Sequence, residues 1–134
     1  MLRHFGRCAL IVVFGGAYQG KREFVLSEFK LTEEDIFVCQ TDGKIDLNKK
    51  AIAHLERFIL YRIQEGLGVF DFFEENSGKL EESIIICDDI SCGVVPVDKT
   101  LRLWRDNTGK QMQIFCRKAR EVYRVYCGIA ERLK

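Results

Sequence analysis

The sequence predicts an α/β domain with a small, mainly parallel sheet. Short apolar runs alternate along the chain with segments whose apolar residues recur at helical spacing, and a glycine-rich turn joins the first run to the first such segment. Strands that alternate with helices imply right-handed crossovers between parallel neighbours. With 134 residues and 47% hydrophobic content, the chain suits one domain over residues 1–134.

Four strands are expected. Each is short and largely apolar, which is typical of strands that are covered on both faces. They are Cys8–Phe14, Asp35–Gln40, Ser83–Cys87 and Glu121–Cys127.

Helices are expected between these strands. The first, Lys21–Phe29, follows the glycine-rich turn directly. The second, Leu47–Glu65, has Asp46 as a candidate N-cap and Gly66 as a stop. Its apolar face combines Ile52, Leu55, Ile59 and Ile63.

The later part of the chain predicts two more helices. A short one lies within residues 68–76 and is followed by a break at residues 76–78. A longer one runs from about Asp98 to Ala119, and Gly109 inside it marks either a kink or close packing.

The glycine-rich turn has the spacing of a phosphate-binding loop. Gly15 and Gly20, followed by Lys21, fit the pattern G-x-x-x-x-G-K, in which backbone N–H groups converge on phosphate oxygens. The next position usually holds a Ser or Thr that helps to bind Mg²⁺, but here it is Arg22. We therefore expect a loop that suits phosphate better than metal; the alternative is a glycine-rich turn with no ligand. The expected binding residues are Gly15, Gly16, Ala17, Tyr18, Gln19, Gly20, Lys21 and Arg22.

Two adjacent carboxylates follow the third expected strand. Asp88 and Asp89 stand where a strand's carboxyl end would bring them towards the phosphate loop, and we expect them to hold Mg²⁺. Acids also cap loops, so a purely structural role is the alternative.

Charge and cysteine content narrow the function classes. Residues 99–134 hold ten Lys or Arg against three acids, a balance of +7, so residues 1–98 carry −6 of the net +1. This basic region predicts a solvated helix face, and a surface that attracts phosphate is the alternative. Without a nucleic-acid motif, no DNA or RNA partner is expected. No apolar run approaches the length of about 20 residues that spans a bilayer, so no membrane partner is expected.

The six cysteines form no C-x-x-C pair and have no His at metal-ligand spacing. Cys8, Cys39, Cys87 and Cys127 lie in or beside apolar runs. Buried free thiols and a cytoplasmic location follow as expectations.

Two blocks resemble the bifunctional adenosylcobinamide kinase / adenosylcobinamide-phosphate guanylyltransferase family. The first is the G-G-A-x-x-G-K loop, and the second is a longer block after the paired aspartates; together they cover about half of the chain. The matching residues of the second block are Gly93, Val95, Pro96, Arg102, Arg105, Asp106, Gly109, Gln113, Glu121, Val122 and Gly128.

The resemblance implies a three-layer P-loop NTPase-like fold and an enzyme of cobalamin biosynthesis. Such enzymes phosphorylate adenosylcobinamide with a nucleoside triphosphate and then transfer GMP from GTP through a guanylylated histidine. The implied ligands are ATP or GTP, Mg²⁺, and adenosylcobinamide or another corrinoid, and the implied assembly is a homo-oligomer. The implied catalytic residues are Lys21, Asp89 and His54. Because His54 lies at the edge of an apolar helix face, an ordinary structural or surface histidine is the alternative for that residue.

Departures from the family pattern leave a second function open. Arg22 replaces a Ser, Asp88 and Asp89 replace Asn-Glu, and no R-I-x-x-H pattern surrounds His54, which is the only histidine in that region. The stretch before Asp88 is also short, so we expect it to lack one strand with its acidic residue. A relative that binds nucleotide or corrinoid without catalysis is the alternative to an enzyme, and a loop that binds nothing is the third reading.

Overall fold

The computed structural model describes residues 9–90 and 96–134. One six-stranded sheet runs through these residues in the order β2-β3-β4-β1-β5-β6. The first five strands of that order are parallel, and β6 pairs antiparallel with β5. The strands are β1 (Ile11–Gly15), β2 (Ile36–Val38), β3 (Ala51–Ala53), β4 (Ile84–Asp88), β5 (Glu121–Tyr126) and β6 (Ile129–Arg132).

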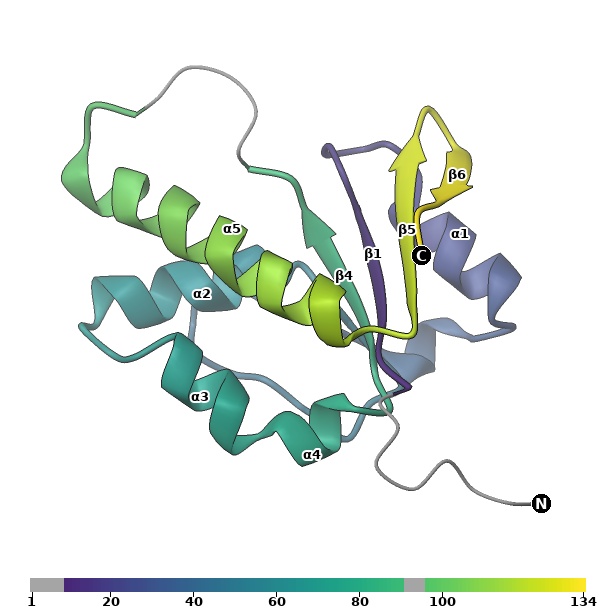
Figure 1. The fold of residues 1–134 in the computed structure, drawn as a ribbon, viewed down its shortest axis with the longest axis horizontal. Helices are drawn as coiled ribbons and strands as arrows, with labels where there is room; N and C mark the ends of the chain where they lie inside the picture. Colours follow the sequence, from purple (N-terminus) through teal and green to yellow (C-terminus); the bar gives the residue numbers. More distant parts are fainter. Residues whose placement is uncertain (1–8, 91–95) are drawn as a thin grey trace.

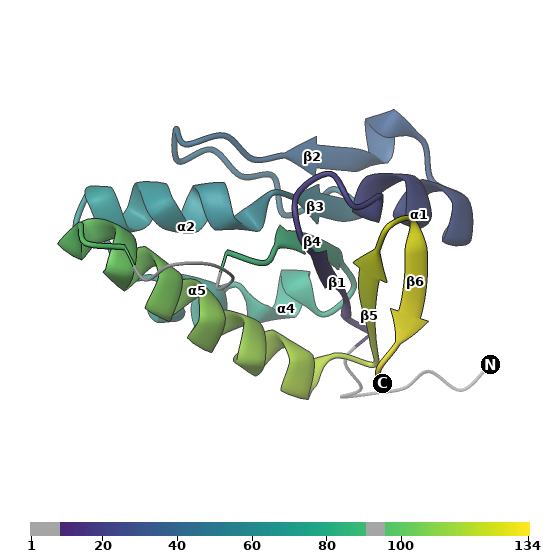
Figure 2. The same ribbon diagram turned by 90° about the horizontal axis from the view of Figure 1, so that it is seen from above.

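Helices cover both faces of the sheet (Figures 1 and 2). The helix α1 lies on one face, and α2, α3, α4 and α5 lie on the other. This is the three-layer P-loop NTPase-like fold that was expected. The helices are α1 (Lys21–Glu28), α2 (Leu55–Gln64), α3 (Phe70–Glu75), α4 (Ser77–Leu80) and α5 (Lys99–Lys118), with a 3₁₀ turn, η1, at Glu33–Asp35.

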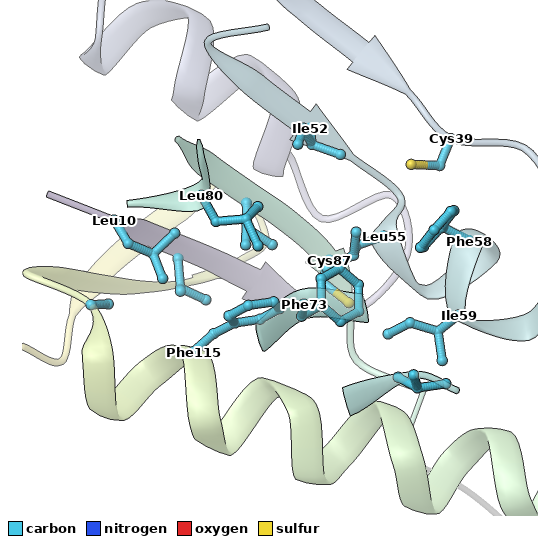
Figure 3. Close-up of a cluster of buried hydrophobic side chains, with 14 of the residues drawn as sticks. Leu10, Cys39, Ile52, Leu55, Phe58, Ile59, Phe73, Leu80, Cys87 and Phe115 are labelled. Carbon is cyan, nitrogen blue, oxygen red and sulfur yellow. The ribbon is translucent and has the colours of Figure 1, made fainter. Parts of the chain in front are cut away.

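Two apolar clusters hold the layers together. Because side chains alternate along a strand, Val12 and Val13 of β1 enter opposite clusters, and both are fully buried. Val13 packs with Val25 of α1. On the other face, Phe58, Phe73 and Phe115 bring α2, α3 and α5 into one cluster (Figure 3). The ring centroids of Phe73 and Phe115 lie 5.2 Å apart in an edge-to-face arrangement.

The predicted helix over Leu47–Glu65 is wrong in its first eight residues. Residues Ala51–Ala53 form β3, which pairs with both β2 and β4, and α2 begins only at Leu55. Ile52, which was assigned to a helix face, is therefore a fully buried strand residue. Asp46 accepts a hydrogen bond from the backbone N–H of Asn48 and so closes a turn instead of capping a helix. A run of three apolar residues is too short to show strand periodicity.

Two further elements were not predicted. Residues 76–78 were expected to be a break, but α4 begins at Ser77, and only Asn76 separates it from α3. The strand β6 follows a two-residue turn in which Cys127 and Gly128 have φ values of 51° and 76°. Positive φ at both central residues is typical of two-residue hairpin turns. The Gly at the second turn position, Gly128, was the sequence signal for this hairpin.

Several expectations concern single residues. Cys39 and Cys87 are buried free thiols, as predicted, whereas Cys127 is exposed in the hairpin turn. Cys8, Cys92, Gly93 and Val95 lie outside the described residues. Across the described ranges, no helix combines the length and the apolarity needed to cross a bilayer.

Candidate functional site

The site lies where β1, β3 and β4 end. The strand β1 stands between β4 and β5, and the chain leaves β1 and β3 towards helices on opposite faces of the sheet. Where successive connections leave a parallel sheet towards opposite faces, a crevice opens at the carboxyl ends of the strands. Here it brings together the loop after Gly15, the turn after Ala53 and the carboxylate of Asp88.

Two glycines make the loop conformation possible. A Cβ atom on Gly15 would lie 2.3 Å from the carbonyl oxygen of Val125, so a side chain there would collide with the backbone of β5. Gly20 has a φ of 96° and stands directly before α1, a backbone conformation that other residues adopt only under strain. The spacing of the motif thus has a steric reason at both positions.

The β5–β6 hairpin turn holds the loop in place. The carbonyl oxygen of Gln19 accepts a hydrogen bond of 2.8 Å from the backbone N–H of Gly128. The side-chain oxygen of Gln19 accepts another, of 2.6 Å, from the N–H of Cys127. Tyr18, by contrast, projects fully into solvent and has a φ of 60°.

The loop presents unused backbone donors. Among the described residues, none accepts a hydrogen bond from the backbone N–H groups of residues 16–21. A run of free N–H groups at the start of a helix creates a positive potential that favours an anion. The local geometry is therefore suited to phosphate oxygens.

Lys21 is buried at the first position of α1. Its ammonium group donates to the carbonyl oxygen of Gly16 at 2.6 Å and pairs with Asp88 Oδ1 at 2.8 Å. An ammonium group has three donors, so these two contacts leave one for a further acceptor. Arg22 lines the same cavity, and its guanidinium pairs with Glu33.

His54 reaches the same crevice from the turn between β3 and α2. Its Nδ1 atom lies 2.9 Å from Glu56 Oε2 and 3.8 Å from Asp88 Oδ2. The residue adopts a left-handed backbone conformation with a φ of 57°, which is uncommon for residues other than Gly, although His adopts it more readily than most. His54 was expected near the site, and the structure places its Nδ1 atom just beyond hydrogen-bond distance of Asp88 Oδ2.

Glu56 is the residue that sequence reasoning missed. Its side chain is 5% exposed, and Oε1 accepts a hydrogen bond of 2.9 Å from the backbone N–H of Asp88. Burial alone would raise the pKa of Glu56, but the hydrogen bonds from His54 and from Asp88 outweigh it, so the pKa lies below its ordinary value. The carboxylate is therefore ionised at neutral pH.

Glu56 also corrects the expectation that this stretch lacks a strand and an acid. The strand β3 is present, and Glu56 follows it by three residues. A carboxylate shortly after a short apolar run was the signal available in the sequence.

Asp88 and Asp89 share one cavity and differ in the others that they line. Asp88 lines a cavity of about 220 Å³ together with residues 17–23, His54 and Arg57, and Asp89 does not. Both carboxylates line a second cavity of about 360 Å³, which extends along α5 past Arg105 and Gly109. Only Asp88 therefore borders the cavity that also contains Lys21 and His54.

The described residues contain one group of side chains with the composition of a metal site. It comprises His54, Glu56 and Asp88, and each offers a ligand atom within 4.8 Å of the other two. Only Asp88 belongs to the pair that the sequence suggested for Mg²⁺.

Comparison with known proteins bears on this arrangement. The family model for cobinamide kinase / cobinamide phosphate guanyltransferase matches residues 68–133, which include β4, α5 and the β5–β6 hairpin. A comparison with curated proteins finds no match.

Proposed function

Because this chain belongs to the cobinamide kinase / cobinamide phosphate guanyltransferase family, we propose that it binds ATP or GTP and phosphorylates adenosylcobinamide. One observation carries the proposal. Lys21, the free N–H groups of the loop and Asp88 all border the same cavity at the carboxyl edge of the sheet. This arrangement matches what a triphosphate requires, namely backbone donors with a cation beside them.

Lys21 supplies the positive charge that contacts the phosphate in this site. In the structure its ammonium group contacts Gly16 O and Asp88 Oδ1. When a triphosphate enters, the ammonium group exchanges Gly16 O for a phosphate oxygen and keeps Asp88 as its anchor. Buried charge pairs are strong in such a place because little water screens them.

The acceptor occupies the neighbouring cavity along α5. That cavity has Asp89 at its rim and Arg105 and Gly109 on its helical wall, and the last two belong to the block that matches the family. The hydroxyl oxygen of the substrate bonds to the γ-phosphorus while the bond from that phosphorus to the β–γ bridging oxygen breaks. The hydroxyl proton passes to Asp89. Phosphoryl transfer depends on such positioning and on charge neutralisation more than on covalent assistance.

The residues of this site provide only some of the ligands that Mg²⁺ usually has beside a phosphate-binding loop. Asp88 Oδ2 is an oxygen ligand of the kind that Mg²⁺ prefers, whereas Arg22 stands where a hydroxyl ligand is usual. Asp88 would hold the ion, which when bound neutralises phosphate charge. The steps assigned above to Lys21 and Asp89 use only groups of the chain.

The test measures binding and turnover separately. Purified protein is titrated calorimetrically with ATP and GTP, and is then incubated with either nucleotide, Mg²⁺ and adenosylcobinamide. We expect nucleotide binding and a phosphorylated corrinoid, and we expect Lys21→Ala to abolish both. Lys44→Ala, which removes an exposed loop lysine, is the matched control and should behave as the wild type.

The outcomes separate the candidate functions. Binding without product would support the alternative, a relative that binds nucleotide without catalysis. If neither nucleotide binds at millimolar concentration, both proposals are wrong.

Guanylyl transfer through His54 is a second candidate. The contact between Nδ1 and Glu56 would orient the ring and leave Nε2 with a lone pair for attack on the α-phosphorus of GTP, with release of pyrophosphate. Incubation with GTP labelled in its α-phosphate should then give an acid-labile protein adduct that His54→Asn lacks. Absence of label from the wild type would exclude this step.

A further inference from the structure

We propose that His54, Glu56 and Asp88 form a binding site for a transition-metal dication of the zinc type, which shares only Asp88 with the Asp88–Asp89 pair that the sequence suggests. The site needs no nucleotide, so its existence can be tested whether or not the proposed kinase activity is found.

The distances match a coordination sphere. Ligands at about 2.1 Å from a zinc ion lie roughly 3.0–3.4 Å from one another in octahedral or tetrahedral geometry. The separation from His54 Nδ1 is 2.9 Å to Glu56 Oε2 and 3.8 Å to Asp88 Oδ2. The three ligand atoms lie within 4.8 Å of one another, so the carboxylate of Asp88 must move closer to the other two groups to complete the triangle.

The two carboxylates are already oriented by other groups. Glu56 uses Oε1 to accept the hydrogen bond from the Asp88 backbone, and Asp88 uses Oδ1 to pair with Lys21. In each case the second oxygen, Oε2 or Oδ2, is the one that faces His54. Outer contacts that fix one oxygen of a carboxylate and leave the other for the ion are characteristic of metal sites.

Further contacts fix the backbone of the site. The indole N–H of Trp104 donates a 2.8 Å hydrogen bond to the carbonyl oxygen of Glu56, which ties α5 to the start of α2. His54 stays in a strained left-handed conformation that directs its ring at the carboxylates. Negative charge also favours a cation, because among the described residues the ion-pair partners of Glu56 and Asp88 are Lys21 and His54, and His54 is charged only when it is protonated.

The ligand set selects the class of ion. Imidazole suits zinc, cobalt and other transition metals, whereas Mg²⁺ and Ca²⁺ prefer oxygen alone. Coordination through Nδ1 moves the ring proton to Nε2. A metal-bound His54 therefore lacks the lone pair that guanylyl transfer would need, so the two roles of His54 exclude each other.

The experiment uses the full chain, freed of metal with a chelator and of any histidine tag. Zn²⁺ is titrated by competition with a coloured chelator, and Co²⁺ binding is followed by its visible absorption. The chain has a single tryptophan, and because Trp104 contacts Glu56, its fluorescence reports on the same site. We expect one ion per chain, no thiolate-to-cobalt charge-transfer band and no displacement by excess Mg²⁺.

Variants assign the ligands. His54→Asn keeps a residue that tolerates the left-handed backbone, and Glu56→Gln keeps the shape of the side chain. Each should weaken Zn²⁺ binding by at least roughly tenfold, since even the loss of an outer contact costs that much. His4→Asn removes the only other histidine, and Asp89→Asn removes the neighbouring carboxylate; both should bind Zn²⁺ as the wild type does.

Several results would overturn the proposal. Unchanged Zn²⁺ affinity in His54→Asn would do so, as would a cobalt spectrum with thiolate character or loss of binding in Asp89→Asn. Circular dichroism identifies any variant that does not fold, and since His54 is about one-third exposed, its variant gives the decisive result should Glu56→Gln unfold.

Discussion

Single side chains at the carboxyl edge of the sheet carry the chemistry of this protein, and Glu56 connects most of them. Its carboxylate contacts His54 and the backbone of Asp88, and its carbonyl oxygen accepts from Trp104. A charge in so buried a position destabilises a fold unless hydrogen bonds compensate for lost hydration. Glu56 has that compensation, which explains why its pKa is lowered despite burial.

The lowered pKa of Glu56 predicts a specific pH dependence of stability. The ionised group stabilises the fold above its ordinary pKa of 4.5, and this contribution is lost as pH falls through the lowered folded-state pKa. Urea unfolding of the wild type and Glu56→Gln should differ by roughly 1–3 kcal/mol at neutral pH, with the wild type more stable. The difference should shrink below pH 4.5, where the carboxyl becomes protonated and resembles the amide.

The exposed Glu82 supplies the control, because Glu82→Gln should have little effect at any pH. A difference between wild type and Glu56→Gln that stays constant from neutral to acidic pH would contradict the role assigned to the ionised carboxylate.

Helices and strands differ in how far local sequence specifies them. The helix α5 was expected over Asp98–Ala119 and is observed over Lys99–Lys118, with the Asp98 side chain accepting hydrogen bonds from two backbone N–H groups of its first turn. Twenty residues of consistent spacing and a capping residue make such a helix predictable. The strand β3 has three residues and no signal of its own, and it exists because β2 and β4 supply hydrogen bonds on both sides.

Gly109 offers a test of the helix α5. Close packing was one expectation for this residue, but an added Cβ atom would meet nothing within 4 Å, and the helix continues through it. Gly109→Ala should therefore raise the free energy of unfolding by about 0.5–1 kcal/mol, because Ala loses less backbone entropy in a helix. Chemical denaturation measures the change.

Gly43 provides the opposite case for comparison. It has a φ of 79°, and an added Cβ atom would lie 2.5 Å from the Tyr61 ring, so Gly43→Ala should destabilise the fold. If Gly109→Ala destabilised the protein as well, the inference that Gly109 has open space beside it would be wrong.

The whole molecule is a three-layer fold whose sheet order creates the crevice. Alternation of apolar runs with helical segments predicted the class of fold, and the family match over residues 68–133 agrees with it. The order of the strands was not predictable in the same way, because pairing partners depend on contacts far apart in the sequence. That order places β1 beside β4, so that Gly15 aligns with Asp88 and Lys21 can reach the Asp88 carboxylate.

The glycine-rich loop and Lys21 are predictable from the amino-acid sequence, because a loop of this kind is specified by residues that are neighbours in the chain. The grouping of His54, Glu56 and Asp88 is not. Glu56 is 32 residues from Asp88 and 48 from Trp104 along the chain, so their contacts depend on how β3, β4 and α5 pack. Local pattern indicates which groups are available, whereas strand register and helix packing bring distant groups to the same point.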